Sequence, residues 1–218
     1  MEIIQKMLIN IHCHSYTNNG LEILNYEGSI PSSFFSYGLL SDSITSNIDP
    51  TIITNNKCIA IGEIGLDKTF QTPINKQIEI FKKQVLLAKE NELPILLHCV
   101  KAWNEIRAVK KEIQTNSCWI YHGFRKTSIA SEVLNEGLLI SIGTAVRFDK
   151  KLQECVKEIP MQKLFLETDA TMEFSIQDVY EKVALLKNVS LQELEQNIFE
   201  NFLNHFKKWD IGWKEPNY

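Results

Sequence analysis

The sequence lacks the features that would divide the chain or carry it across a membrane. Its 218 residues include only nine glycines and six prolines, and no low-complexity segment separates two domains. No apolar run approaches the roughly 18–20 residues that a membrane span needs. Residues Met1–Lys6 carry a glutamate and no small-residue cleavage site follows them, which argues against a signal peptide. We therefore expect a single domain, residues 1–218, in the cytoplasm.

The sequence also lacks paired cysteines and an excess of positive charge. Its five cysteines show no CxxC spacing, and most lie within or beside apolar runs, where a free thiol packs as a small hydrophobe. We therefore expect no disulfide framework. The formal net charge of -4 argues against non-specific duplex binding, because proteins that bind in this way carry a basic face. It does not exclude a nuclease, because metal ions in a site supply positive charge.

What the sequence does contain is a series of short apolar runs, which predict eight strands. Most runs are continuously apolar, as is typical of parallel strands that are buried on both faces. The runs are Met7–Ile11, Leu21–Tyr26, Phe34–Leu40, Cys58–Ile61, Pro94–Leu97, Cys118–Tyr121, Leu138–Ile142 and Lys163–Leu166.

The stretches between the later runs predict helices. Ile74–Asn91 has apolar residues at helical spacing, and Pro94 opens the next run. The other predicted helices are Ala102–Thr115, Ser128–Asn135, Asp149–Glu158, Ile176–Lys187 and Leu191–Lys207, the last with Ser190 as its N-cap.

Alternating strands and helices favour an α/β fold, a TIM-type (β/α)8 barrel in a single domain. The chain is short for that fold, and its first two connections have no room for full helices, so we expect a distorted barrel. Periodicity alone leaves an open, doubly wound sheet as the alternative.

Four of the five histidines lie where apolar runs end: His12, His14, His98 and His122. In a parallel barrel the carboxyl ends of all strands open on one face, where barrel active sites form. His12 and His14 are two residues apart, so both rings point to the same side of an extended strand. This spacing suits two imidazoles on one metal ion. A single histidine at a strand end, in contrast, is more often a packing or surface residue.

Two carboxylates occupy equivalent positions. Glu63 follows an apolar run in the segment Ile61–Asp67, and Asp169 follows another in Leu166–Asp169. Gly62 and Gly65 are expected to allow a close backbone approach and a sharp exit from the strand. Taken alone, Glu63 fits a salt bridge or a helix cap, and Asp169 fits a helix N-cap.

Together, these six side chains predict a metal centre. Neutral imidazole plus carboxylate suits zinc, manganese, iron or cobalt, and magnesium is a further candidate.

Five segments in this order resemble the TatD family of metal-dependent hydrolases. The match runs along nearly the whole chain, and its most specific parts resemble a short branch of the family. The segments are Ile11–His14, Ile61–Asp67, Pro94–His98, Ile120–Phe124 and Leu166–Asp169.

The resemblance implies two divalent metal ions (magnesium, manganese or zinc) and hydrolysis of phosphodiester bonds, in several members from the 3′ end of DNA. It implies that His12, His14, Glu63 and Asp169 hold one ion. Glu63 would bridge to the second ion, which His98 and His122 complete. Asp169 and Glu63 are thus the expected catalytic residues, because two ions lower the pKa of a shared water and Asp169 would take its proton. Lys101 and Arg125 are the cations expected to contact a phosphate of single-stranded DNA or another phosphodiester.

The chain departs from the family pattern at three places. Gly38–Ser41 lacks the histidine and proline of the common Gly-x-His-Pro, Ala170 replaces a common proline, and His98–Val100 replaces His-Ser-Arg. No metal ligand is lost, but substrate contacts change. Two other functions therefore remain open: a metal-dependent hydrolase of an amide or ester, such as an aminoacyl ester, and a non-catalytic metal-binding barrel. No membrane partner is expected.

Overall fold

The computed structural model describes residues 7–40, 48–171 and 173–209. The expectations for Met1–Lys6 and for Ser41 fall outside these residues. The chain forms two compact units. The first unit takes the described residues up to Leu24 together with Tyr121–Asn204, and the second takes Asn25–Ile120 and the described residues from His205 onward.

The first unit is built on parallel strands that are almost wholly buried. Strand β1 pairs with β2, and β7 pairs with β8. A parallel bridge between Cys13 and Asp169 brings the chain after β8 next to β1. The strands are β1 (Ile9–Cys13), β2 (Leu21–Asn25), β7 (Leu139–Ile142) and β8 (Leu164–Leu166).

The second unit holds a parallel ladder in which β4 lies between β3 and β5. Strand β6 follows β5, and Ile95 N–H donates to the carbonyl of Cys118 at the approach to β6 (2.8 Å). The strands are β3 (Phe35–Tyr37), β4 (Cys58–Asp67), β5 (Ile95–Val100) and β6 (Trp119–Tyr121).

In both units, strands that pair are consecutive along the chain, and the last strand lies beside the first. This is the strand order of a TIM-type barrel. A doubly wound sheet instead reverses its order at a switch point and leaves its first and last strands apart. The alternative of an open, doubly wound sheet is therefore wrong.

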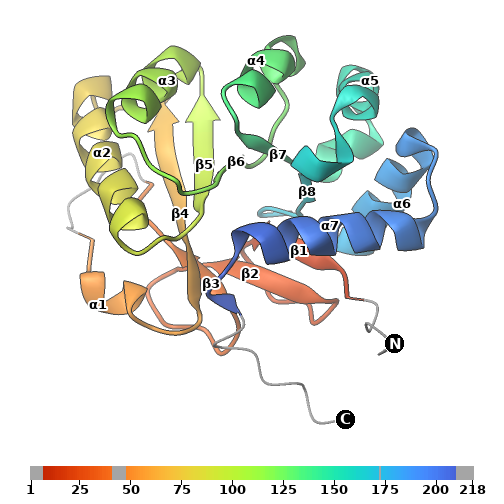
Figure 1. Ribbon diagram of the computed structural model, residues 1–218, viewed down its shortest axis with the longest axis horizontal. Coiled ribbons are helices and arrows are strands. Elements are labelled where there is room, and N and C mark those ends of the chain that lie inside the picture. Colours follow the sequence, from red (N-terminus) through yellow and green to blue (C-terminus); the bar gives the residue numbers. More distant parts are fainter. Residues whose placement is uncertain (1–6, 41–47, 172, 210–218) are drawn as a thin grey trace. The chain divides into compact units, whose positions relative to one another are not determined.

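The predicted helices are present, most with ends shifted by a few residues. In the second unit α2 packs on β4, and α3 packs on β4 and β5 (Figure 1). In the first unit α6 packs on α5 and β8. The helices are α1 (Pro50–Ile53), α2 (Ile74–Glu90), α3 (Trp103–Glu112), α4 (Ala130–Asn135), α5 (Lys150–Glu158), α6 (Ile176–Lys187) and α7 (Leu191–His205).

Three short 3₁₀ turns complete the connections: η1 (Thr127–Ile129), η2 (Thr144–Arg147) and η3 (Met161–Lys163). The links from β1 to β2 and from β2 to β3 contain no helix in the described chain, as their length predicts.

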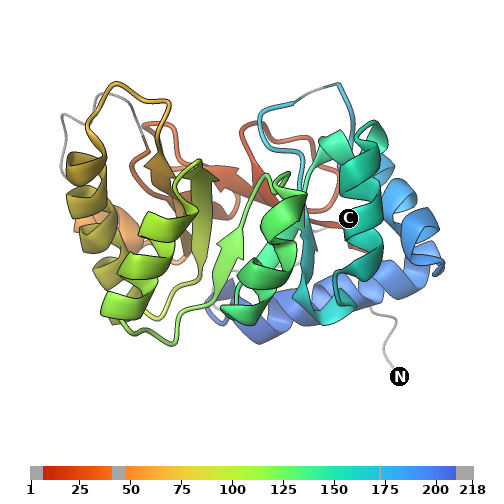
Figure 2. The same ribbon diagram turned by 90° about the horizontal axis from the view of Figure 1, so that it is seen from above.

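Local sequence explains where the helices begin and which faces they bury. Asp149 caps α5 by accepting from the N–H groups of Lys151 and Leu152, and Ser175 forms a capping box with Asp178 at α6. The apolar face of α2 is buried, and Figure 2 shows α2 and α3 on the same side of the β4–β5 pair. No helix in the described ranges is long and apolar enough to cross a membrane.

Candidate metal centre

In the first unit, main-chain hydrogen bonds hold β1 against the segment that follows β8. The N–H of Asp169 donates to the carbonyl of His12 (3.0 Å), and the N–H of His14 donates to the carbonyl of Asp169 (3.3 Å). The three predicted ligands are therefore aligned by backbone pairing rather than by flexible loops. Such rigid support is what a metal site requires of its ligands.

Asn10 fixes the same junction through its side chain. Its amide nitrogen donates to Oγ1 of Thr168 (2.9 Å), and its amide oxygen accepts from the N–H of Thr168 (3.0 Å). Both residues are buried, so these bonds are shielded from water. The motifs in the sequence give no sign of Asn10, because an asparagine within a predicted strand is not distinctive.

The side chains of His12, His14 and Asp169 converge. Nε2 of each histidine lies 3.5 Å from Oδ1 of Asp169. Each of the three residues offers a ligand atom, and these atoms all lie within 4.8 Å of one another. One divalent ion fits a set of this size, because its bonds to imidazole nitrogen and carboxylate oxygen are about 2.0–2.2 Å long. The prediction that His12 and His14 face the same side is confirmed.

Asp169 has a strained backbone conformation and an ionised side chain. Its φ of 56° lies in the left-handed region, which costs a residue other than glycine of the order of 1 kcal/mol and is often found at functional sites. Hydrogen bonds with His12 and His14 hold the pKa of Asp169 far below its usual value, against the opposing effect of burial. The carboxylate is therefore ionised at neutral pH, as a metal ligand must be.

His122 and Glu167 form a second group around Asp169. Nδ1 of His122 lies 3.5 Å from Oε1 of Glu167, and these two residues and Asp169 offer ligand atoms within 4.8 Å of one another. Glu167 is fully buried, and its Oε1 accepts from the N–H of Gly123 (2.5 Å). Its Oε2 has no hydrogen-bond partner among the described residues. A buried carboxylate oxygen left in this way fits a cation nearby.

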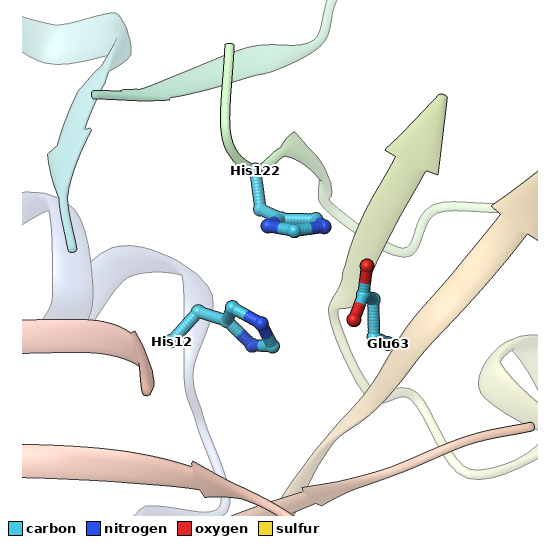
Figure 3. A group of neighbouring side chains, drawn as sticks. All are labelled: His12, Glu63 and His122. Carbon is cyan, nitrogen blue, oxygen red and sulfur yellow. The ribbon is translucent and has the colours of Figure 1, made fainter. Parts of the chain in front are cut away.

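Glu167 was not among the predicted ligands, although it stands in the Leu166–Asp169 motif. Its spacing gave no signal, because its contacts are with Gly123 and His122, which are distant in the sequence. Figure 3 shows the rings of His12 and His122 turned toward one another, with centroids 4.4 Å apart. The figure also draws Glu63, which projects from β4 of the second unit.

In the second unit, His98 lies between two carboxylates. Its Nδ1 is 2.5 Å from Oε1 of Glu63, and its Nε2 is 3.1 Å from Oδ2 of Asp67. Which ring nitrogen donates depends on the tautomer, but each nitrogen has a carboxylate oxygen within hydrogen-bond distance, so the orientation of the ring is fixed. A carboxylate that orients a histidine in this way is common behind metal ligands.

Asp67 is therefore a second residue that the sequence-based site did not include. Burial raises the pKa of Asp67, but hydrogen bonds from Thr69 and His98 outweigh this effect and hold the pKa below its usual value. Both Thr69 bonds end on Oδ1, which leaves Oδ2 for His98. The motif Ile61–Asp67 contained this residue, but nothing in its spacing distinguished it from a surface carboxylate.

Gly62 and Gly65 were predicted to allow a close backbone approach and a sharp exit from the strand. Only the close approach is observed. A Cβ on Gly65 would lie 1.8 Å from the carbonyl oxygen of His98, and one on Gly62 would lie 2.5 Å from Cβ of Leu96. The close approach of β4 and β5 therefore requires glycine, as predicted. The expected sharp exit is wrong, because β4 continues to Asp67 and places Glu63 inside the strand.

His12 and His98 also lie inside their strands rather than after them, because β1 and β5 extend to Cys13 and Val100. Each strand stays paired to its neighbour beyond the histidine, although the histidine interrupts the apolar run. His122 and Asp169, in contrast, follow β6 and β8 as predicted.

The two predicted phosphate contacts lie in different units. Arg125 belongs to the first unit, its side chain is 68% exposed, and its Nη2 is 4.0 Å from a carboxylate oxygen of Asp149. Lys101 directly follows β5 in the second unit and is exposed. Cys13 and Cys99, which adjoin predicted ligands, are both buried. Burial raises the pKa of Cys13 to about 12, so this thiol stays protonated.

Sequence comparisons agree with this chemistry. Residues 40–207 match the family described as TatD related DNase. The Bacillus subtilis protein named uncharacterized metal-dependent hydrolase YabD is 32% identical over 170 residues, covering 70% of this chain and 67% of that protein. The Klebsiella pneumoniae protein named 3′-5′ ssDNA/RNA exonuclease TatD is 35% identical over 127 residues, covering 55% of this chain and 48% of that protein.

A solved structure agrees with the fold. The crystal structure of YjjV, a TatD homolog from Escherichia coli K12, matches with a TM-score of 0.73 and 19% identity, covering 92% of this chain and 98% of that one. At this identity the likeness concerns the fold alone. It confirms the predicted TIM-type barrel.

Proposed function

We propose that this chain, which belongs to the TatD family of metal-dependent hydrolases, cleaves phosphodiester bonds of single-stranded DNA from the 3′ end. The observation that carries the proposal is the group formed by His12, His14 and Asp169, whose ligand atoms lie within 4.8 Å of one another. No side chain is required as a nucleophile. Water is the attacking group, and the residues of the chain hold and deprotonate it.

The donor set of the first unit fits a divalent ion. Two imidazoles and an ionised carboxylate are ordinary ligands for zinc or manganese, and magnesium takes the carboxylates readily. Such an ion lowers the pKa of a water and offsets the charge on phosphoryl oxygens when it is bound. Oε2 of buried Glu167 accepts no hydrogen bond from the part of the chain that the structure describes, which supports a cation in this region.

Asp169 is proposed as the proton acceptor. Its side chain is 45% exposed while His12 beside it is fully buried, so a water can reach the carboxylate and not the ring. Because Asp169 is ionised and its backbone is fixed to β1, it holds the water at one position and takes its proton as the attack begins.

We further propose that Glu63 would be a ligand shared by two ions, and that His98 and His122 would hold the second one. Glu63 and His98 are joined within the second unit, where Asp67 fixes the orientation of the imidazole ring. That the ligand groups of both units serve one centre stays a prediction. So do the phosphate contacts of Lys101 and Arg125.

The proposed substrate class is based on the names of the related proteins. One of them is named as an exonuclease on single-stranded DNA and RNA, whereas YabD is named only as a metal-dependent hydrolase. The matched segments span about two thirds or less of these relatives, so the substrate of the whole protein is part of the proposal. Hydrolysis of an amide or ester is the second candidate, because Leu40 stands where many members carry the histidine of Gly-x-His-Pro.

The test compares three substrates under one condition. Metal-stripped protein is reloaded with manganese, magnesium or zinc and incubated with 5′-labelled single-stranded DNA, an aminoacyl ester and an amide. The proposal predicts a ladder of DNA products shortened one nucleotide at a time from the 3′ end, only with metal. Cleavage of the ester or amide without DNA cleavage would support the second candidate. Reloaded protein that cleaves none of them would favour a non-catalytic metal-binding barrel.

A further inference from the structure

In the first unit, an aromatic pair with one exposed ring and one half-buried ring lies on the loops that leave the candidate metal centre. Phe148 follows η2, and Phe174 lies in the loop after β8, five residues beyond Asp169. Their ring centroids are 5.3 Å apart, and Phe148 is 65% exposed. A phenylalanine ring left in water forgoes roughly 1.5–3 kcal/mol of burial, which a ligand that covers the ring would recover.

Packing onto the first turns of the following helix can explain the position of only one of the two phenylalanines. Each phenylalanine directly precedes an N-cap, the position from which an apolar side chain can pack onto the fourth residue of a helix. In α6 that residue is Val179, which is buried. In α5 it is Gln153, whose amide donates to the carbonyls of Val146 and Arg147. Phe148 therefore has no apolar partner of this kind in its own helix.

The surroundings hold the rings in place. The guanidinium of Arg147 lies 4.5 Å from the centroid of Phe174, and its Nη1 donates to Oδ1 of Asp178 (2.9 Å). The N–H of Phe148 donates to the carbonyl of Ala145 (3.1 Å). The Phe174 ring and the backbone of Phe148 therefore lose little conformational freedom when a ligand binds.

The charges around Phe148 indicate the chemistry of that ligand. The exposed Lys150 and Lys151 follow it at the start of α5, where the helix dipole disfavours cations. Arg125 extends beside Asp149, the residue next to Phe148. The carboxylate of Asp149 is engaged as the α5 cap. Aromatic rings bordered by cations suit a base and its phosphate.

The pair is also connected to the ligand group of the same unit. Gly143, the residue before η2, lies so near Glu167 that a Cβ added to it would be 3.6 Å from Cγ of that side chain. From there the chain runs through η2 directly to Phe148. A single-stranded nucleic acid bound on the aromatic pair would thus lie along the loops that start at Glu167 and Asp169.

We propose that Phe148 and Phe174 form a stacking platform for a base of single-stranded nucleic acid, with Lys150, Lys151 and Arg125 facing its phosphates. This inference rests on the proposed function, whose substrate class it specifies. The platform binds bases without reading their sequence, because every base has a π-face.

The test measures binding to the metal-loaded, full-length protein. A labelled hexathymidylate with cleavage-resistant phosphorothioate linkages is titrated with wild type and with Phe148→Ala, Phe148→Trp and Leu185→Ala. Leu185 is the matched control, because it is a 74% exposed apolar residue in the last turn of α6. A strand of equal length without bases separates stacking from contacts to phosphate.

Phe148→Ala is expected to weaken binding to hexathymidylate by about five- to tenfold, the low end for one exposed stacking residue. Binding to the abasic strand stays within about twofold, Phe148→Trp restores affinity for hexathymidylate, and Leu185→Ala changes neither. In cleavage assays the loss should appear in KM more than in kcat, because stacking is the same before and during the reaction.

Unchanged affinity of Phe148→Ala for hexathymidylate would overturn the platform, and so would an equal loss for both strands. If wild type cleaves DNA and Phe148→Ala binds it normally, only the platform fails. If metal-loaded wild type neither binds nor cleaves any strand, the proposed function fails together with it.

Discussion

The two units carry ligand groups of different construction. In the first unit, His12, His14 and Asp169 come from two chain segments that are fixed to each other by backbone hydrogen bonds. In the second unit, Glu63 and His98 lie inside two long paired strands, and His98 is held between Glu63 and Asp67. The first group offers three ligand atoms for one ion. The second offers a histidine whose orientation is set before any ion arrives.

This difference implies a division of labour. The first group contains the exposed, ionised carboxylate that a water can reach, so we assign it the chemical step. We expect the second group to contribute charge and rigidity, because its carboxylates lie on both sides of one imidazole ring. Changes in the first group should therefore affect turnover most strongly, and changes in the second should affect metal retention.

The largest expected effect is that of Asp169→Asn. An amide neither accepts a proton from water nor supplies a full negative charge, so kcat should fall by about 10²–10⁴-fold. Cleavage of single-stranded DNA by metal-saturated protein measures this. The melting temperature should remain near that of wild type, because the side chain is half exposed. A variant with wild-type turnover would show that Asp169 is not the proton acceptor.

The number of metal ions retained per chain should differ between the Glu63→Gln and His98→Ala variants. Glu63→Gln removes an anionic oxygen from the proposed bridging position and should lower the retention of both ions. His98→Ala should lower the retention of one ion. Elemental analysis of dialysed proteins gives the number of ions per chain. Equal metal content in wild type and Glu63→Gln would contradict the bridging role.

Asp67→Asn should have a smaller effect on the same measurement. It keeps the shape of the side chain but weakens the acceptor that orients His98, a change that typically costs about 10–100-fold in metal affinity. Competition with a chelator of known affinity reports the loss. Asp178→Asn is a suitable control, because this carboxylate also forms hydrogen bonds but takes part in a helix cap. If both variants lose affinity equally, Asp67 has no specific role at His98.

The smallest expected effect is on stability, and it is measured by comparing alanine substitutions at two asparagines. Asn10→Ala leaves the buried Thr168 N–H and hydroxyl unpaired and should lower the free energy of unfolding by about 1–3 kcal/mol. Asn25→Ala in the second unit removes one acceptor, which binds the N–H of Glu63 (3.1 Å), at a less buried position. Urea denaturation should show the larger loss for Asn10→Ala. The reverse order would mean that the junction of β1 with Thr168 contributes little to stability.

Sequence patterns predicted the strands well, because continuous apolar runs mark strands that are buried on both faces. They placed the strand ends less well, since β4 continues past Glu63 to Asp67, and this glutamate and its neighbouring glycines interrupt the apolar run that marks the strand. The histidines and Asp169 could be found from their spacing.

Asn10, Asp67 and Glu167 could not be found in this way. Each acts through a partner that is distant in sequence: Thr168 for Asn10, His98 for Asp67, and Gly123 and His122 for Glu167. Such contacts depend on how the strands lie against one another, and the order of residues along the chain does not encode them directly.

The most direct test of the central claim is the position of a metal ion. Crystals grown with zinc are measured at the zinc absorption edge, and an anomalous difference map locates each ion. The account predicts a peak about 2.0–2.2 Å from imidazole nitrogens of His12 and His14 and from a carboxylate oxygen of Asp169. Full zinc occupancy elsewhere in the crystal, with no peak at these three residues, would contradict it.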